Sequence, residues 1–298
     1  MAASGRIMLV FVMSNALWQG AVAALAGVAF TLLYRSARFL DFGFAAAALW
    51  AAYVAQQLVT VYGLGVFVAS ALAIACVAVS GAACHVFLYR SAAADDSRAL
   101  PNLLASLGAY LVLQNGLLLW LGPRNVAFFN DPKWMDWRGS VAGRAGLFAI
   151  VVVTLVATGS SLQFTGLGLL MRAAGSNPRL ASDWGLHVSR LLVGATGSAY
   201  ALAGVVGIVM GIDTNLQPGM GFRVLMIAVV ASIVGGVTSL SGAAFAGVAL
   251  GVVTQVAAWY VGPEWSETIL LLLFVAALLM RPAGILTAAT EARHLGGG

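Results

Sequence analysis

Long apolar runs separated by short polar breaks cover almost the whole chain. The runs extend over residues 7–34, 39–60, 62–89, 99–121, 143–164, 187–211, 222–238, 241–262 and 266–282. A helix needs about 20 apolar residues to cross the hydrocarbon core of a bilayer. The shorter alternating pattern of a membrane β-barrel is absent. The runs therefore predict an all-α, polytopic transmembrane helical bundle with about eight or nine spans.

Two of the breaks are unusually tight, one at residues 35–43 and the other at residues 235–242. The second contains the adjacent glycines Gly235 and Gly236 and interrupts an otherwise apolar region. The run before it is short for a full crossing, and irregular backbone at membrane depth occurs where it is buried in protein. We therefore expect broken or re-entrant helices at these two places.

Composition agrees with a membrane protein. The 298 residues are 61% hydrophobic and 8% charged, with a mean hydropathy of +0.97, whereas soluble domains carry roughly 25% charged residues. We expect one transmembrane domain over residues 1–298 with the lipid bilayer as its partner. The scattered basic residues give no basis for nucleic-acid binding, and the two cysteines read as small buried side chains.

The distribution of basic residues predicts the orientation. Nine of the 15 Lys and Arg residues fall in one alternating set of loops and six in the other. Cytoplasmic loops carry the excess of such residues. The N-terminus is therefore predicted outside and the C-terminus in the cytoplasm. The nine are Arg35, Arg38, Arg90, Arg98, Arg172, Arg179, Arg190, Arg281 and Arg293.

Catalytic motifs are missing from the sequence. A nucleotide-phosphate loop needs a lysine after glycine, and the single lysine, Lys133, follows proline. There is no HExxH or GxSxG motif, and the three histidines are far apart in sequence. We therefore expect no enzyme, no metal site and no cofactor in this chain. If ATP drives the protein, another subunit hydrolyses it.

The spans contain neutral polar side chains and few ionisable ones. Asn15 and Gln19 are four residues apart and share a helix face, and Gln114 and Asn115 lie in a later span. Such groups form hydrogen bonds between helices or line a translocation path, and both readings stay open. Proton-coupled and ion-coupled carriers usually bury acids or histidines in their spans. Here only Asp41 and His85 come close.

Asp41 stands at the start of a span, in the stretch Arg38–Phe44. One interpretation is a helix cap that accepts a backbone N–H from Gly43 or Phe44, where the helix dipole favours an acid. The other is a role at a break beside the translocation path, with Gly43 letting the backbone turn.

Residues 166–190 form the longest hydrophilic segment, which we place in the cytoplasm. Pro178 suits the first turn of a helix with Asn177 as its cap, and a short amphipathic helix should continue through Ala181 and Trp184. Such a helix needs lipid headgroups or a partner protein to pack against. On the outer side, Phe128, Phe129, Trp134 and Trp137 predict either an interfacial aromatic belt or a docking surface.

Ordered motifs over nearly the whole chain resemble the permeases of branched-chain amino acid-type ABC importers, a family that includes urea and short-amide permeases. The matching segments are Asn15–Gly20, Thr31–Tyr34, Arg38–Ala45, Ala52–Ala55, Leu107–Asn115, Met171–Ala173, Ala201–Gly204, Gly235–Ala243 and Met280–Leu286. Asp41 stands where the family usually has asparagine.

The resemblance implies a bacterial inner-membrane permease that moves a small polar solute by alternating access. The solute would be a branched-chain or other amino acid, urea or an amide. A second permease subunit (identical or different), two cytoplasmic ATPase subunits and an extracytoplasmic solute-binding protein would complete the importer.

The resemblance also assigns candidate residues. Segment 166–190 becomes the coupling segment that docks in an ATPase groove, with Arg172, Ala173, Asn177, Ala181, Gly185 and Leu186 as its candidates. The candidate solute path comprises Asn15, Gln19, Asp41, Gly43, Gln114, Asn115, Gly235 and Gly236. The alternative is an ATP-independent secondary carrier or channel for a small neutral solute.

Overall fold

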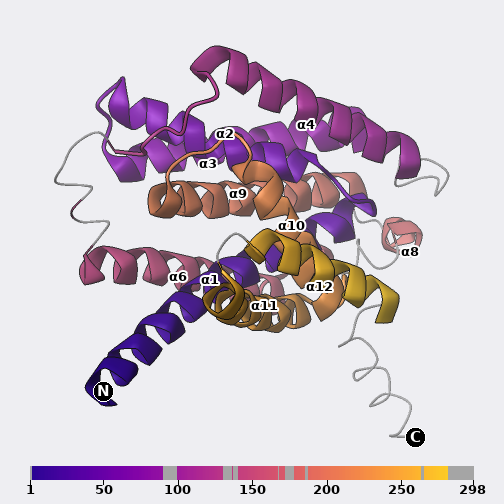
Figure 1. Cartoon of the computed structure of the whole chain (residues 1–298). Coiled ribbons are helices and arrows are strands. Elements are labelled where there is room, and N and C mark those ends of the chain that lie inside the picture. The colour runs from indigo at the N-terminus through magenta and orange to yellow at the C-terminus, as the bar shows by residue number, and fades with distance from the viewer. Residues whose placement is uncertain are drawn as a thin grey trace, which may run out of the picture. The chain divides into compact units, whose positions relative to one another are not determined.

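The computed structural model describes residues 2–89, 99–129, 136, 140–166, 168–171, 178–184, 187–262 and 265–280. Within these ranges every extended regular element is a helix, and the β-structure is confined to one isolated bridge (Figure 1). The prediction of an all-α fold is confirmed for the described part of the chain.

Apart from α8, which lies in the hydrophilic segment 166–190, the helices coincide with the predicted apolar runs. They are α1 (Ala2–Ala37), α2 (Gly43–Thr60), α3 (Val66–Cys84) with the π-helix η1 (His85–Tyr89), α4 (Ala99–Leu121), α6 (Val141–Phe164), α8 (Pro178–Asp183), α9 (Val188–Thr214), α10 (Met220–Gly235), α11 (Leu240–Val261) and α12 (Ser266–Met280). The two predicted breaks fall between α1 and α2 and between α10 and α11.

Six of the described helices are long and apolar enough to cross a membrane, namely α1, α3, α4, α6, α9 and α11. The chain is therefore a multi-pass membrane protein, but the expected count of eight or nine spans is not confirmed. Helix α10 has 16 residues. At 1.5 Å per residue it is about 24 Å long, shorter than the bilayer core of about 30 Å. Its shortness agrees with the prediction from the sequence.

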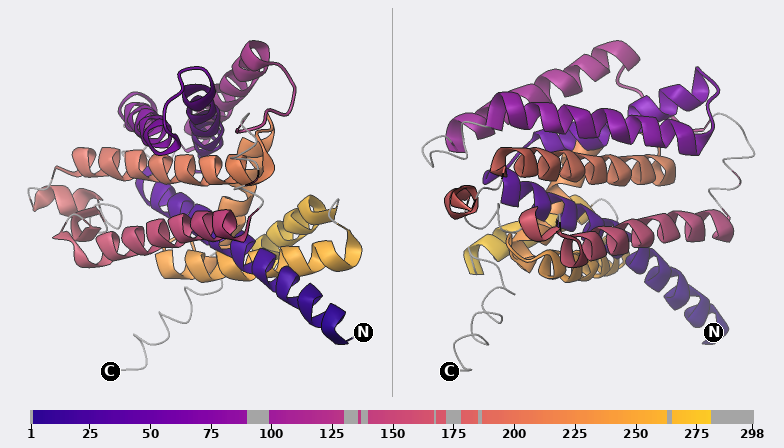
Figure 2. Two further views of the ribbon diagram at one scale, coloured as in Figure 1. Left: turned by 90° about the vertical axis from the view of Figure 1, so that its left-hand side faces the viewer. Right: turned by 180° about the vertical axis from the view of Figure 1, so that it is seen from behind.

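The helices, which Figures 1 and 2 show from three sides, belong to two compact units. The first unit comprises residues 1–31 and 226–298, and the second comprises residues 32–225. Helices α1 and α10 each contribute residues to both.

In the first unit, α1 and α11 pack closely through small residues. A Cβ built on Gly20 would lie 3.0 Å from the carbonyl oxygen of Val248. A Cβ on Gly247 would overlap the backbone of Ala24, and one on Gly251 would overlap the backbone of Gly20. Small residues four apart on facing helices permit such backbone contact in membrane proteins. One hydroxyl pair, Thr31 with Ser232, adds a buried hydrogen bond of 2.9 Å.

The break between α10 and α11 is built from glycines and a serine cap. Gly236 has φ of 92°, a conformation that favours glycine. The Ser239 hydroxyl accepts the Gly242 N–H at 3.0 Å and so caps α11. The backbones of Gly235 in α10 and Gly242 in α11 are in contact, so a side chain at either position would collide with the backbone of the other helix.

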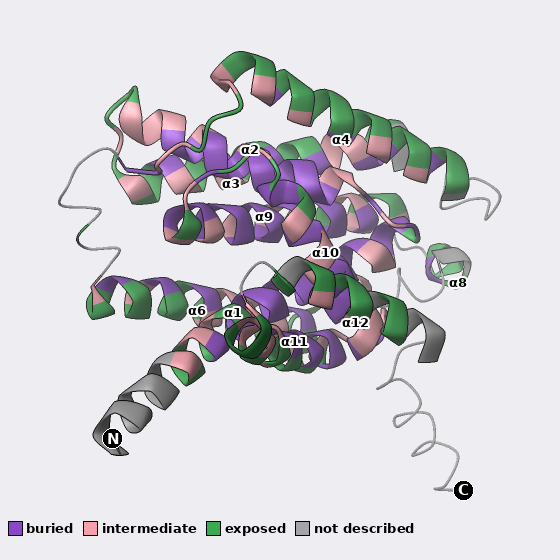
Figure 3. Ribbon diagram, in the orientation of Figure 1, coloured by how far each residue is buried: buried purple, intermediate pink, exposed green. Residues whose placement is uncertain are grey.

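In the second unit, α2 packs against α3, α4 and α9, and α3 packs against α9. Helix α2 presents alanines, and a Cβ on Gly207 of α9 would overlap the backbone of Ala48. In an apolar stretch of 18 residues, 72% of the residues of α9 are buried, compared with 17% in the corresponding stretch of α4. Figure 3 shows the same difference, with buried residues along α2 and α9 and exposed ones along α4. Helix α9 is therefore the central helix of this unit.

The loop after α4 is folded against the end of α9. Val126 and Leu216 exchange backbone hydrogen bonds of 3.0 and 2.9 Å. Phe128 and Phe129 are buried and pack edge to face with ring centroids 5.0 Å apart. The expectation of an aromatic belt or docking surface is therefore wrong for these two residues, because they pack into the protein interior. Trp134 and Trp137 lie outside the described residues.

Replacing Gly251 with alanine should destabilise the first unit. The added methyl group meets the backbone of Gly20, and overpacking of this kind costs about 1–3 kcal/mol. The midpoint of thermal unfolding in detergent measures the effect. Gly159→Ala on α6 is the matched control, because no atom of another helix in the described part of the chain lies within 4 Å of its added Cβ. Equal midpoints for the two variants would contradict the close packing.

Candidate functional site

Asp41 is completely buried in the break between α1 and α2. Its Oδ1 accepts the Gly43 N–H at 2.7 Å, and its Oδ2 accepts the Tyr200 hydroxyl at 2.7 Å. A carboxyl group buried in an apolar protein is costly unless it is hydrogen-bonded, and these two bonds come from the start of α2 and from α9.

The local sequence explains how Asp41 reaches this position. Arg38 adopts a left-handed conformation with φ of 59°, and its N–H bonds to the Tyr34 carbonyl at 2.8 Å. This is a common way for a helix to end. Helix α2 starts two residues beyond Asp41, and its N-cap residue is Phe42, whose side chain gives no capping bond. The bond from the Gly43 N–H to Asp41 confirms the capping interaction that the sequence predicts, one position earlier than a standard N-cap.

Tyr200 of α9 lies in a space left by two glycines. A Cβ on Gly81 of α3 would overlap the Tyr200 ring, and one on Gly43 would overlap its hydroxyl oxygen. The side chain is 2% exposed. Both glycines are therefore required for the tyrosine to reach the carboxylate of Asp41.

One turn earlier on α9, Thr196 makes a second group of hydrogen bonds. Its Oγ1 lies 2.8 Å from Nδ1 of His85, 3.0 Å from Oγ of Ser36, and donates to the Leu192 carbonyl at 3.0 Å. His85 is buried and begins the π-helix η1. Single turns of π-helix occur frequently at functional sites.

These five buried side chains form what we call the α9 polar network: Ser36, Asp41, His85, Thr196 and Tyr200. Thr196 and Tyr200 are four residues apart, so they share one face of α9. That face of α9 therefore contacts the last turn of α1, the break after it and the start of η1.

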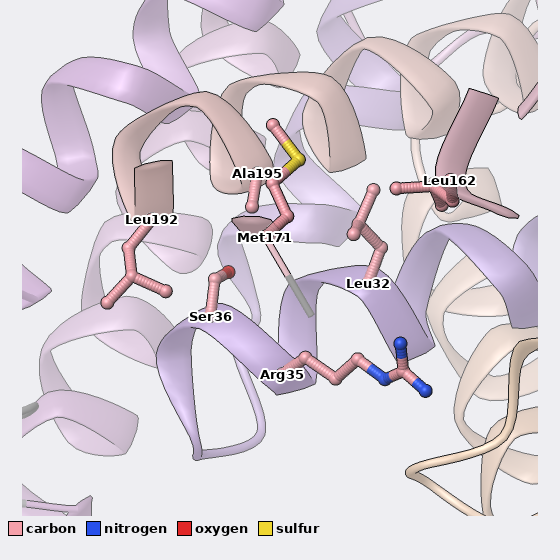
Figure 4. Close-up of a pocket in the computed structure, with 7 residues that line it drawn as sticks. All are labelled: Leu32, Arg35, Ser36, Leu162, Met171, Leu192 and Ala195. Carbon is pink, nitrogen blue, oxygen red and sulfur yellow. The ribbon is translucent and has the colours of Figure 1, made fainter. Parts of the chain in front are cut away.

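A small cavity adjoins the network at Ser36 (Figure 4). Its volume is about 10 Å³, enough for about one water molecule. It is lined by Leu32, Arg35, Ser36, Leu162, Met171, Leu192 and Ala195. The space is far too small for an amino acid. Among the described side chains, no group of three or more His, Cys, Asp and Glu residues is placed to hold a metal ion.

The residues predicted for a solute path fall in both units. Asp41 and Gly43 come together in the α9 polar network. On α4, the Gln114 amide donates to the Pro218 carbonyl at 3.3 Å, whereas the Asn115 amide donates to Leu111 of its own helix at 2.7 Å. Asn15 and Gln19 belong to α1, with Asn15 half-buried and Gln19 exposed, and Gly235 and Gly236 form the second break.

Of the predicted coupling residues, the structure describes Ala181, which is buried on α8. Helix α8 begins at Pro178, as the sequence predicts, and packs against α9. Trp184 just beyond it is 81% exposed. Arg172, Ala173, Asn177, Gly185 and Leu186 lie outside the described residues.

The sequence alone does not predict Tyr200, Ser36 or the pairing of His85 with Thr196 as parts of this site. The signal available in the sequence was a threonine and a tyrosine four residues apart within one apolar run. Their spacing marks a polar face on a buried helix, but it does not identify which residues lie opposite that face.

The chain is similar to known permeases over most of its length. Residues 12–278 match the family model described as the permease component of branched-chain amino acid transport systems. The high-affinity branched-chain amino acid transport system permease LivH of Salmonella typhimurium is 27% identical over 201 residues, which cover 64% of this chain and 65% of LivH. No solved structure matches the chain.

Two further relatives match different lengths. The high-affinity branched-chain amino acid transport system permease BraD of Pseudomonas aeruginosa is 25% identical over 293 residues, 91% of this chain and 94% of BraD. A probable LivH of Methanocaldococcus jannaschii is 29% identical over 143 residues, 46% of this chain and 45% of that protein.

Replacing Thr196 with valine should destabilise the second unit. Valine has nearly the same shape but leaves His85 and Ser36 without the Thr196 hydroxyl, and a buried group without its partner costs about 1–3 kcal/mol. Thermal unfolding in detergent measures the loss. Thr158→Val is the control, because its hydroxyl bonds to the Thr154 carbonyl of its own helix. A loss no larger than in this control would show that the network contributes little to stability.

Proposed function

The chain belongs to the family of permease components of branched-chain amino acid transport systems, and from this membership we propose that it is the permease subunit of an ATP-binding cassette importer. The family match over residues 12–278 carries the proposal. The six helices able to cross a membrane support it, because a solute path needs several spans around it. The substrate class we propose is a small polar solute, with branched-chain amino acids first and other amino acids, urea and amides after them.

The proposed importer contains further subunits. A second permease, identical or different, completes the pore, two cytoplasmic ATPase subunits bind and hydrolyse ATP, and an extracytoplasmic binding protein delivers the solute. Hydrolysis of ATP by separate subunits agrees with the absence of a nucleotide-phosphate loop from this sequence. We place the N-terminus outside and the C-terminus in the cytoplasm of a bacterial inner membrane, following the distribution of basic residues.

Segment 166–190 is the proposed contact with an ATPase subunit. Helix α8 within it packs on α9, and Ala181 of α8 is buried. Leu180 and Trp184 are 58% and 81% exposed. A short helix with exposed apolar side chains between two membrane helices is suited to a groove on a partner.

The proposed function is tested by uptake into proteoliposomes. The chain is reconstituted with the proposed second permease and ATPase subunits, and radiolabelled leucine is supplied with the binding protein. Uptake should require hydrolysable ATP and should stop with a non-hydrolysable analogue. Labelled urea in parallel distinguishes the solute classes. Uptake that persists without ATPase subunits, or that an ion gradient alone drives, would refute an ABC importer and favour a secondary carrier.

Replacing Ala181 with leucine should uncouple ATP hydrolysis from uptake. The larger side chain cannot fit the buried position on α8 without shifting that helix, and misplacement of a coupling contact impairs transport more than hydrolysis. Uptake per ATP hydrolysed should fall by about tenfold, which corresponds to about 1.4 kcal/mol. Gly116→Leu on α4 is the matched control for added bulk, since open space surrounds its Cβ. Equal ratios for the two variants would contradict a coupling role of α8.

A further inference from the structure

We propose that the hydrogen bond between Tyr200 and Asp41 transmits movement of α9 to the break between α1 and α2, so that both residues position this break during transport. The inference rests on the proposed function, because it assigns a mechanical role within an ATP-driven permease. It concerns two positioning residues rather than residues that bind solute.

Helix α9 connects the proposed coupling segment directly with the network. Helix α8 packs on α9, and residues 184–187 join the two helices in the chain. Tyr200 follows Val188, the first residue of α9, by three helical turns, or about 18 Å along the axis. A hydrogen-bonded helix is a rigid element over this distance, so a displacement of its beginning also displaces Tyr200.

The network holds both sides of the break through α9. Thr196 bonds to Ser36 in the last turn of α1 at 3.0 Å, and Tyr200 bonds to Asp41 beyond that turn at 2.7 Å. Residues between two helix ends are where hinges absorb changes in backbone angles. A shift of α9 therefore acts on the end of α1 and on the start of α2 through two separate contacts.

Neighbouring helices complete the support of the break. The Ser106 hydroxyl of α4 accepts the Phe42 N–H at 3.2 Å, and His85 of η1 bonds to Thr196 at 2.8 Å. Gly81 leaves space for the Tyr200 ring beside α3. The tyrosine is thus confined sideways by α3 while its hydroxyl reaches Asp41, which makes its hydrogen bond sensitive to movement along α9.

An apolar contact between α9 and the break would transmit movement of α9 less specifically than the hydrogen bond between Tyr200 and Asp41. Hydrogen bonds have narrow ranges of distance and angle, whereas apolar contacts tolerate sliding. Burying a carboxyl group is also costly unless it is satisfied. When α9 moves, the hydrogen bond between Tyr200 and Asp41 therefore either moves Asp41 with the tyrosine or breaks.

The test uses the complete reconstituted importer and compares uptake per ATP hydrolysed. Tyr200→Phe keeps the ring beside Gly81 but removes the hydroxyl. The ratio should fall by about tenfold, the factor expected from losing one hydrogen bond to a carboxylate. Tyr53→Phe is the matched control, because the Tyr53 hydroxyl is buried and has no hydrogen-bond partner among the described residues. Its ratio should stay at the wild-type value.

A double-mutant cycle separates this role from general stability. If Tyr200 and Asp41 act through one contact, Asp41→Ala should lower the ratio as Tyr200→Phe does, and combining them should cause no further loss. In Asp41→Asn the amide oxygen can still accept the Gly43 N–H, and the amide NH₂ can donate to the Tyr200 hydroxyl. This variant should therefore keep most of the coupling. Where the alanine variant fails to fold, a ratio that is kept in Asp41→Asn and lowered in Tyr200→Phe supports the contact, and a ratio that is lowered in neither variant refutes it. Thermal unfolding midpoints are compared to identify losses that arise from instability.

The outcomes distinguish the two proposals. A wild-type importer without ATP-driven uptake would refute the proposed function and this role with it. Normal wild-type uptake with an unchanged ratio in Tyr200→Phe would refute the contact alone. Additive losses in the double mutant, or losses that follow the unfolding midpoint in every variant, would show that the two side chains serve stability and not coupling.

Discussion

A carboxyl group that is buried in an apolar protein needs hydrogen-bond donors, and this requirement determines the packing around the break between α1 and α2. Asp41 obtains one donor from the start of α2 and one from Tyr200 of α9. For Tyr200 to approach, the positions facing it must lack side chains, and they are occupied by Gly43 and Gly81. One buried acid thereby determines residue choice on three other elements, in the way expected where an unpaired polar group would be costly.

The same physical constraint explains the use of small residues elsewhere. In a bilayer, apolar side chains gain little by leaving lipid for protein, so helices associate through close packing and interhelical hydrogen bonds. Gly20, Gly247 and Gly251 supply such packing between α1 and α11, and Gly207 does so between α9 and α2. The apolar residues that remain exposed, such as Leu119 at 90% and Phe87 at 82%, are suited to contact lipid.

Helix breaks connect this packing with function. A continuous helix satisfies its own backbone, whereas a break inside the membrane needs partners from its surroundings. The break after α1 obtains them from Asp41 and from Ser106. The break after α10 obtains its partners from Gly236 and Ser239 within the turn itself. The first break therefore depends on distant helices, and this dependence allows movement of those helices to affect it.

The sequence by itself determined the helical fold, because long apolar runs leave helices as the way to satisfy the backbone in a membrane. It also placed both breaks, the start of α8 at Pro178 and the bond between Asp41 and Gly43, since these depend on residues close together in the chain. Tertiary structure alone decided the partners across helices. Tyr200 meets Asp41, Thr196 meets His85, and Phe128 and Phe129 turn inward. Helical periodicity shows which residues share a face, but the residue opposite that face depends on how separate helices pack.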